Sequence, residues 1–223
     1  LMRFYATDAA KIDVVYPGAD PDLRRVDDET KIAGALTRHG IRPPYLLYLG
    51  TLQPRKNLIR LVEAFAASGL HDQGYSLVLA GKQGWLAAPL LDAIGSLPSA
   101  VRGRVLLPGY IDEIDKSPLI SGATALVFPS LYEGFGFPVL EAQACGTPVI
   151  CANTSSLPEV AGEGALLVDP LDTAALAKAM QRVAGDANLR QNLVAAGHAN
   201  LNRFSWPAAA ARVLDILEAA AAP

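Results

Sequence analysis

Cysteine and histidine are scarce in this sequence, and the few that occur do not form a recognisable site. Cys145 and Cys151 are the only cysteines, and they bracket a short apolar segment. Two cysteines cannot build a disulfide framework, and these have no metal-ligand neighbours, so we interpret them as reduced core thiols. The three histidines, His39, His71 and His198, have no partner at metal-ligand spacing, and we expect all three at the surface. We therefore predict no metal site.

Charge of either sign is also sparse, and no block of like charge stands out. The chain has 19 Lys and Arg against 22 Asp and Glu, which gives a net charge of −3. This balance excludes a basic nucleic-acid footprint, so we expect no nucleic-acid partner. Neither an apolar run of transmembrane length nor a signal peptide is present, and we expect a soluble, cytoplasmic protein. Because the chain begins with Leu1 rather than methionine, we expect its natural N-terminus to lie upstream.

Short apolar runs recur along the chain, and each ends at glycine or at polar residues. Most are continuously apolar, which is typical of strands buried on both faces of a parallel sheet. These runs predict strands at Ile12–Tyr16, Tyr45–Leu49, Ser76–Ala80, Val105–Leu107, Ala125–Phe128, Pro148–Cys151 and Ala165–Val168. Between the runs, apolar residues at helical spacing predict helices, as at Leu58, Leu61, Val62 and Phe65, and at Leu176, Met180 and Val183. The alternation predicts an α/β fold with an open, doubly wound parallel sheet.

Glycine or small polar residues follow most of the predicted strands. Gly50, Gly81 and Gly109 follow three of them, and the segments 130–136 and 153–156 follow two more. In a parallel sheet these turns collect at the carboxyl edge, where open α/β sheets bind ligands. Glycine is also simply common in tight turns, but its repetition favours a site.

The segment from Glu133 to Glu141, EGFGFPVLE, is the most informative in the chain. Its two glycines let the backbone approach a ligand, and Pro138 fits the first turn of a helix. The helix predicted from Val139 to Cys145 would aim free N–H groups at the loop, which suits a diphosphate. Both carboxylates could face one pocket and accept hydrogen bonds from adjacent sugar hydroxyls. The spacing equally allows Glu141 to complement the helix dipole and Glu133 to be solvated.

A basic turn, Gln53–Asn57, lies between a predicted strand and a predicted helix. Arg55 offers a bidentate fork to phosphate oxygens, and Lys56 offers a point charge. Together they could stabilise the charge of a diphosphate leaving group. A solvated basic turn is the alternative. The sequence contains neither a Walker-type phosphate loop nor a G-x-G-x-x-G turn opening the first helix, which disfavours a nicotinamide enzyme.

Three motifs together resemble glycosyltransferase family four. They are YLGTLQPRKN at residues 48–57, the acidic pair around Gly-Phe-Gly-Phe-Pro, and AQACGTPV at residues 142–149. The segments 160–170 and 204–206 add to the match, which covers roughly residues 12 to 220. The resemblance implies the donor-binding, Rossmann-like C-terminal half of a GT-B fold, in a retaining enzyme that transfers a sugar from a nucleotide diphosphate donor. It implies no cofactor and no metal.

Roles for individual residues follow from the resemblance. It implies that Glu141 holds the donor ribose, that Glu133 contacts the transferred sugar as the catalytic residue, and that Arg55 and Lys56 grip the diphosphate. Further donor contacts are implied for the loop and first helical turn, and for the turn that approaches the base: Gly134, Phe135, Gly136, Phe137, Val139, Leu140, Tyr110 and Ile111. Thr51 departs from the arginine or serine of many relatives, which puts one phosphate contact in doubt.

The resemblance also implies a division of the chain and a missing partner. It implies a remnant of an N-terminal domain with the interdomain connection at 1–20, a nucleotide-sugar-binding domain at 21–206, and a crossover helix at 207–223. An absent N-terminal domain would supply the acceptor site, so the chain alone would be incomplete and inactive. Val213, Leu214 and Leu217 would then lack their natural partner, which favours self-association. Peripheral membrane association of the parent stays open.

The run Gly50–Asn57 resembles that of mannosyltransferases, which favours GDP-mannose over a UDP-sugar as donor and a glycan or lipid-linked acceptor. Two other classes stay open. A non-catalytic nucleotide-sugar-binding module would keep the same donor residues. A GT-B nucleotide-sugar epimerase would carry extra acid–base residues that we do not find here.

Overall fold

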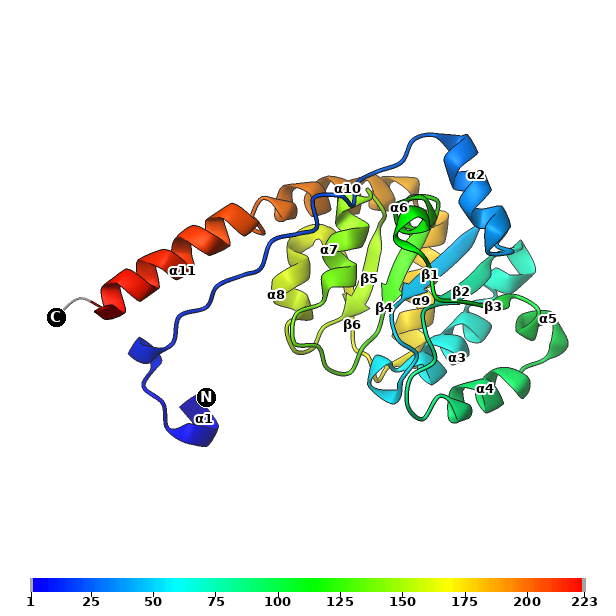
Figure 1. Ribbon diagram of the computed structural model, residues 1–223. Helices are drawn as coiled ribbons and strands as arrows, with labels where there is room; N and C mark the ends of the chain where they lie inside the picture. The colour runs from blue at the N-terminus through cyan, green and yellow to red at the C-terminus, as the bar shows by residue number, and fades with distance from the viewer. Residues whose placement is uncertain (1, 222–223) are drawn as a thin grey trace.

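The computed structural model describes residues 2–221 and contains one six-stranded parallel sheet with helices on both faces (Figure 1). The strands are β1 (Tyr45–Leu49), β2 (Ser76–Ala80), β3 (Val105–Gly109), β4 (Ala125–Phe128), β5 (Val149–Ala152) and β6 (Ala165–Val168). Their order across the sheet is β3-β2-β1-β4-β5-β6, and every pairing is parallel. This is the doubly wound order, in which the winding reverses between β1 and β4. The predicted α/β class and Rossmann-like sheet are confirmed.

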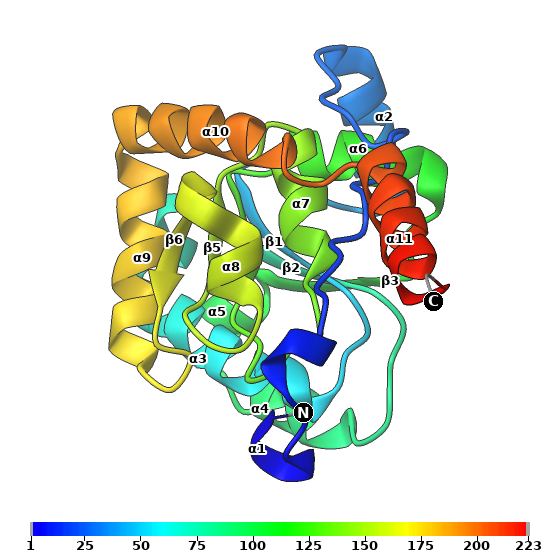
Figure 2. The ribbon, with the colours of Figure 1, turned by 90° about the vertical axis from the view of Figure 1, so that its left-hand side faces the viewer.

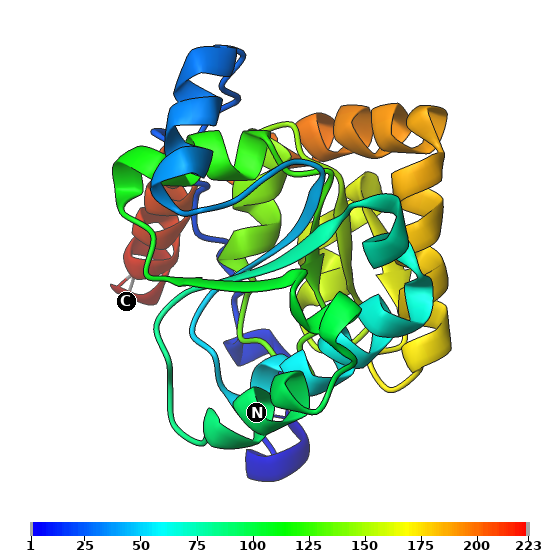
Figure 3. The same cartoon turned by 90° about the vertical axis from the view of Figure 1, so that its right-hand side faces the viewer.

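The helices cover the sheet in two layers. On one side lie α3 (Leu58–Ser68) and α9 (Thr173–Gly185), which pack against each other; α6 (Glu113–Ser121), α7 (Phe137–Ala144) and α8 (Leu157–Ala161) form the other layer. Shorter or peripheral elements complete the fold: α1 (Met2–Tyr5), η1 (Ala9–Lys11), α2 (Glu29–Arg38), η2 (Pro54–Lys56), η3 (Leu70–Gln73), α4 (Ala88–Gly95), α5 (Ser99–Arg102), η4 (Gly162–Gly164), α10 (Ala187–Leu201) and α11 (Trp206–Ala221). Figures 2 and 3 show the two sides of this arrangement.

The central strands are apolar throughout because both of their faces are covered. Every residue of β2, β4 and β5 is buried, as are four of the five residues of β1. The helical predictions also hold, since Leu58, Leu61, Val62 and Phe65 are buried along α3. The apolar residues of α9 are likewise buried. Both predicted core thiols, Cys145 and Cys151, are free and buried, and burial raises the pKa of Cys151 to about 12.

Two expectations about the periphery are wrong. Residues Ile12–Tyr16 form no strand, because no neighbouring strand supplies hydrogen bonds to them in the described residues. His39 and His71 are largely buried, with side chains only 14% and 13% exposed, whereas His198 is exposed as expected. His39 lies against the Asp115 carboxylate at 3.0 Å, and His71 packs edge-on against the ring of Phe65.

The N-terminal segment and α11 project together from the body of the molecule (Figures 1 and 2). Arg212 of α11 donates to Asp13 at 2.5 Å, and the ring of Tyr16 packs on Phe204. No residue of α11 is buried, and Val213, Leu214 and Leu217 are exposed, as predicted. This leaves an apolar surface at one end of the molecule.

Candidate nucleotide-sugar site

The candidate site lies where the winding of the sheet reverses, at the carboxyl ends of β1 and β4. The loop after β1 carries η2 with Arg55 and Lys56, and the loop after β4 carries Glu133 and leads into α7. A crevice forms at such a point because neighbouring loops turn to opposite faces of the sheet. The sheet topology thus brings together two motifs that lie far apart in the sequence.

Glycine allows the loops at this edge to approach each other closely. Gly50 and Gly81 end β1 and β2, and both have φ of 145°, a conformation that favours glycine. A Cβ at Gly81 would lie 2.0 Å from the carbonyl oxygen of Gly50, which no side chain could tolerate. Glycine at position 81 is therefore required for the loops after β1 and β2 to pack against each other.

A three-residue ion cluster joins the two loops. The Glu133 carboxylate accepts from Lys56 Nζ at 2.6 Å and pairs with the Arg55 guanidinium at 2.7 Å. Arg55 also donates to the backbone carbonyl of Tyr132. Lys56 and Glu133 are 9% and 8% exposed, so neither is the solvated group that the spacing also allowed. The two cations predicted to grip a diphosphate are thus held by a carboxylate in this structure.

The pairing sets the charge state of Glu133. Burial by itself raises the pKa of this carboxyl group, but hydrogen bonds from Lys56 and Arg55 outweigh it and leave the pKa below its ordinary value of 4.5. Lys56 also lies 4.9 Å from the centre of the Phe128 ring at the end of β4. Glu133 is therefore ionised at neutral pH, and the cluster is packed against the end of the sheet.

A cavity of about 350 Å³ opens at the same edge of the sheet. It is lined by residues from the loops after β1, β2 and β3 and from the starts of α6 and α7: Leu49, Gly50, Thr51, Gly81, Lys82, Tyr110, Ile111, Glu113, Lys116, Pro138 and Glu141. Lys116 Nζ donates to Glu141 Oε1 at 2.9 Å, and both side chains are about 15% exposed. The cavity therefore presents a fixed carboxylate beside an ammonium group.

Burial raises the pKa of Glu141, and the hydrogen bond from Lys116 opposes that rise without cancelling it. Glu113 and Asp20 raise the pKa further through like charge. The pKa of Lys116 is itself raised, because its pairing with Glu141 outweighs the effect of burial, which by itself lowers it. Glu141 therefore takes up a proton at a higher pH than an ordinary glutamate.

Helix α7 starts at Phe137, two residues before the predicted start. Gly136 precedes it with φ of 115°, and a Cβ there would lie 2.7 Å from Leu157, so glycine is required. Val139 N–H already donates to the Gly136 carbonyl at 3.0 Å, so it is not the free phosphate donor that we expected. Leu140 has a fully buried side chain and can contribute only through its backbone.

The structure thus divides the predicted site residues into two groups. Tyr110, Ile111 and Glu141 line the cavity, whereas Arg55, Lys56 and Glu133 form the ion cluster and are not among the cavity's lining residues. The idea that both glutamates face one pocket is not borne out, because the two cations hold Glu133. Gly134 to Phe137 connect the two groups in the chain.

Sequence reasoning missed the lysines of the cavity. Lys116 reaches Glu141 from a different helix, and Lys82 lies 4.7 Å from the centre of the Tyr110 ring. The only local signal was the position of Lys116 soon after the Gly109–Ile111 turn, which is too weak to single it out.

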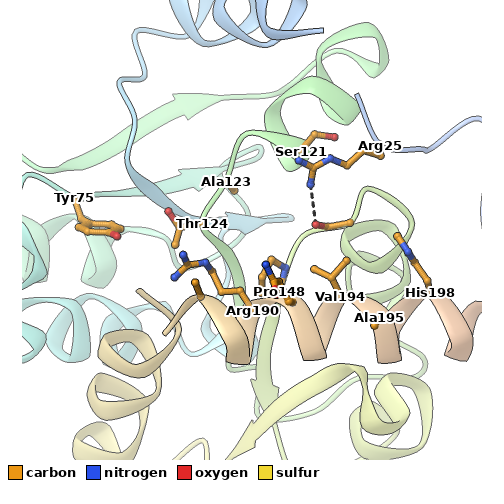
Figure 4. A pocket seen from close by; sticks show the side chains of 13 residues that line it. Arg25, Tyr75, Ser121, Ala123, Thr124, Pro148, Arg190, Val194, Ala195 and His198 are labelled. Carbon is orange, nitrogen blue, oxygen red and sulfur yellow. Dashed lines mark hydrogen bonds between the residues drawn. The ribbon is translucent and has the colours of Figure 1, made fainter. Parts of the chain in front are cut away.

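A larger cavity of about 630 Å³ lies at the opposite edge of the sheet (Figure 4). Tyr75, Thr124 and Pro148, which directly precede β2, β4 and β5, contribute to its lining. Its two arginines already have partners within the chain. Arg25 donates to the Gly146 carbonyl and pairs with Asp27, and Arg190 donates to the carbonyls of Val183 and Ala184. We therefore do not assign the donor site to this larger cavity.

Residues 2–221 contain neither a candidate metal site nor a candidate membrane-spanning helix. No group of three or more His, Cys, Asp or Glu side chains in this range lies together in a way that could hold a metal ion. No helix in this range is both long enough and apolar enough to cross a membrane.

Comparison with known proteins identifies the family. Residues 37–199 match Glycosyl transferases group 1. O-antigen chain mannosyltransferase B of Escherichia coli is 37% identical over 163 residues, which cover 73% of this chain and 42% of that protein. The D-inositol 3-phosphate glycosyltransferase of Rhodococcus opacus (strain B4) is 34% identical over 225 residues, which cover 96% of this chain and 49% of that protein. The structure of Anabaena Alr3699/HepE in complex with UDP has a TM-score of 0.84 at 21% identity, over 96% of this chain and 59% of that chain.

The chain thus spans less than half the length of each of these two relatives. The likeness to the Anabaena protein establishes the shared fold. The family match includes both loops of the ion cluster and all the residues of the cavity, and it confirms the resemblance drawn from the motifs. The chain belongs to the glycosyl transferases group 1 family.

Proposed function

We propose that this chain is the donor-binding half of a retaining glycosyltransferase and that it binds a nucleotide diphosphate sugar at the carboxyl edge of its sheet. The observation that carries the proposal is that the carboxyl edge of the sheet holds both the Arg55–Glu133–Lys56 ion cluster and a cavity lined by Glu141. Cations suit a diphosphate, and a fixed carboxylate suits a pair of hydroxyls.

In this arrangement the nucleoside occupies the cavity. Glu141 accepts hydrogen bonds from the ribose hydroxyls, and the turn of Tyr110 and Ile111 borders the base. Lys116 fixes the orientation of Glu141 and favours its ionised form. Each role uses a group that lines the cavity, so the nucleoside needs no rearrangement of the backbone.

The diphosphate lies toward the ion cluster. Its oxygens compete with the Glu133 carboxylate for Arg55 and Lys56. The loop before α7 and the first residue of that helix add N–H donors, from Gly134 to Phe137. As the bond to the sugar breaks, these groups stabilise the charge that develops on the leaving diphosphate. When the diphosphate has replaced the Glu133 carboxylate on Arg55 and Lys56, Glu133 is free to orient the transferred sugar. The acceptor hydroxyl then attacks the sugar from the same face as the leaving diphosphate. No metal is required for this charge stabilisation.

GDP-mannose is the favoured donor. The motif Gly50–Asn57 resembles that of mannosyltransferases, and O-antigen chain mannosyltransferase B is among the relatives. The Anabaena protein, with 21% identity, is described in complex with UDP, so UDP-sugars are the competing class.

A second domain would supply the acceptor site, and the reaction would take place between the two domains. The surface for that second domain includes the apolar face of α11, with Val213, Leu214 and Leu217 exposed, and the segment around Tyr16. Without that domain the same surface favours self-association. A cytoplasmic location, with peripheral membrane contact of the whole protein, completes the proposal.

Calorimetric titration of this chain with GDP, UDP and ADP tests the donor site. We expect one nucleoside diphosphate to bind with a 1:1 stoichiometry and GDP to bind most tightly. If UDP binds most tightly, a UDP-sugar replaces GDP-mannose as the proposed donor. If none of the three binds, the proposed site is overturned. Retention of the anomeric configuration is tested by NMR of the product. That product is made with a protein that includes the second domain.

A further inference from the structure

Asn57 lies directly after Lys56 and has an unusual backbone conformation. Its φ and ψ are 61° and 34°, in the left-handed region that few residues other than glycine adopt. Asparagine is among the side chains that tolerate this region best. The residue ends η2 and begins α3, so the left-handed turn redirects the chain immediately after the two basic side chains.

The Asn57 side chain connects three loops at the carboxyl edge. Its amide nitrogen donates to the carbonyl of Pro129 at 3.1 Å and to the carbonyl of Pro170 at 2.7 Å. Pro129 follows β4 and Pro170 follows β6, whereas Asn57 itself belongs to the loop after β1. One side chain thus ties together the ends of three strands.

The orientation of the amide is unambiguous. A carbonyl oxygen can only accept a hydrogen bond, so the amide nitrogen must face Pro129 and Pro170. The amide oxygen accepts from Arg60, one turn further along α3, at 2.8 Å. Asn57 is 7% exposed, so its polar groups have little access to water as a substitute partner.

We propose that Asn57 is a positioning residue, which fixes the loop carrying Arg55 and Lys56 against the loop carrying Glu133. The inference rests on the proposed function. Within it, Asn57 touches neither donor nor acceptor, and it acts by keeping Lys56 at the distance from the end of β4 that a bound diphosphate needs. A backbone bond from Leu131 N–H to the Arg55 carbonyl at 2.9 Å joins the same two loops nearby.

The chain contains a matched control for this role. Asn200, at the end of α10, is also 7% exposed, and its amide nitrogen also donates twice, to Gln143 and to the carbonyl of Val160. Its amide oxygen accepts from Arg203 three residues later, as that of Asn57 does from Arg60. Asn200 thus has the same burial and hydrogen bonding but does not join the loops of the candidate site.

The test compares Asn57→Gly with Asn200→Ala by calorimetric titration with GDP and by thermal unfolding. Glycine keeps the left-handed backbone and removes only the side-chain bonds. We expect both variants to unfold at lower temperature, but only Asn57→Gly to bind GDP about tenfold more weakly, since small misplacements of binding groups are costly. An unchanged dissociation constant in Asn57→Gly would overturn the inference and leave the proposed function standing.

Arg60→Ala gives a second measurement if Asn57→Gly fails to fold. It leaves both bonds to Pro129 and Pro170 but removes the donor to the amide oxygen, which loosens the hold on the side chain. We expect a smaller but measurable loss of GDP affinity, restored in part by Arg60→Lys. No loss in Arg60→Ala would count against the inference. If the unaltered chain binds no nucleoside diphosphate, the proposed function falls, and the inference falls with it.

Discussion

The two edges of the sheet use their positive charges in different ways. At the amino edge, Arg190 donates to the backbone carbonyls of Val183 and Ala184, and Arg25 donates to the Gly146 carbonyl and pairs with the exposed carboxylate of Asp27. At the carboxyl edge, Arg55 and Lys56 pair with the side chain of Glu133. A backbone carbonyl is a fixed part of the fold, whereas a side-chain carboxylate can be exchanged for another anion. The larger cavity is therefore the less suited to a diphosphate, and the chemistry of the partners is a better guide than cavity size.

Replacement of Lys56 by alanine should give the largest effect on binding. The variant loses a charge-assisted contact to the diphosphate, and we expect the affinity for GDP to fall about 100-fold, or roughly 2.7 kcal/mol. Calorimetric titration measures this loss, and circular dichroism checks that the variant is folded. A GDP affinity within threefold of that of the unaltered chain would mean that the diphosphate binds elsewhere. The carboxyl edge would then have no advantage over the amino edge as a diphosphate site.

Replacement of Glu133 by glutamine should separate stability from binding. Lys56 loses its charged hydrogen-bond partner, so we expect the free energy of unfolding at pH 7 to fall by about 2 kcal/mol. Nucleoside diphosphate affinity should not weaken, because the competing carboxylate is gone. Weaker binding of GDP in Glu133→Gln would show that Glu133 assists the diphosphate rather than competing with it.

The stability effect of Glu133 should depend on pH. Because its pKa is lowered in the folded state, ionised Glu133 stabilises the fold above its ordinary pKa of 4.5, and this contribution is lost as the pH falls through the folded-state value. The difference in unfolding free energy between the unaltered chain and Glu133→Gln should therefore shrink below about pH 4.5. A difference that stays constant to pH 3 would contradict the ion cluster.

Replacement of Glu141 by alanine should weaken GDP binding about tenfold, since two hydroxyl contacts in the cavity are lost. The raised pKa of Glu141 adds a pH dependence: affinity of the unaltered chain should fall on mild acidification, as the carboxylate is protonated. Lys116, which favours the charged form, and Glu113 and Asp20, which oppose it, are the charged groups near it. The same acidification should leave the affinity of Glu141→Gln less affected.

Replacement of Arg190 by alanine should give the smallest effect. Two carbonyls at the end of α9 lose their donor, and we expect a loss of about 1 kcal/mol in unfolding free energy with no change in GDP affinity. Urea unfolding and calorimetry on the same preparation measure both quantities. Weaker GDP binding in this variant would mean that the amino edge contributes to the site.

Local sequence patterns predicted most of the fold. The continuous apolar runs and the helical spacing along α3 and α9 depend on near neighbours in the chain, and the strands and helices formed where expected. The run Ile12–Tyr16 shows the limit of this reasoning, since an apolar segment becomes a strand only where another strand pairs with it.

The candidate site was harder to predict because its contacts span the sequence. The motifs identified Lys56, Glu133 and Glu141, but no local pattern indicates that Lys56 pairs with Glu133 or that Lys116 reaches Glu141. Both pairs arise from the order of the strands. Asn57 was visible in the motif only as a polar residue, and its links to two distant prolines appear only in three dimensions.

The most direct test of the proposed donor site is a side-by-side calorimetric titration of the unaltered chain, Lys56→Ala, Glu141→Ala and Arg190→Ala with the nucleoside diphosphate that binds best. We expect binding to weaken about 100-fold, about tenfold and not at all in the three variants, in that order. Equal affinities in all four proteins, or a loss confined to Arg190→Ala, would contradict a donor site at the carboxyl edge.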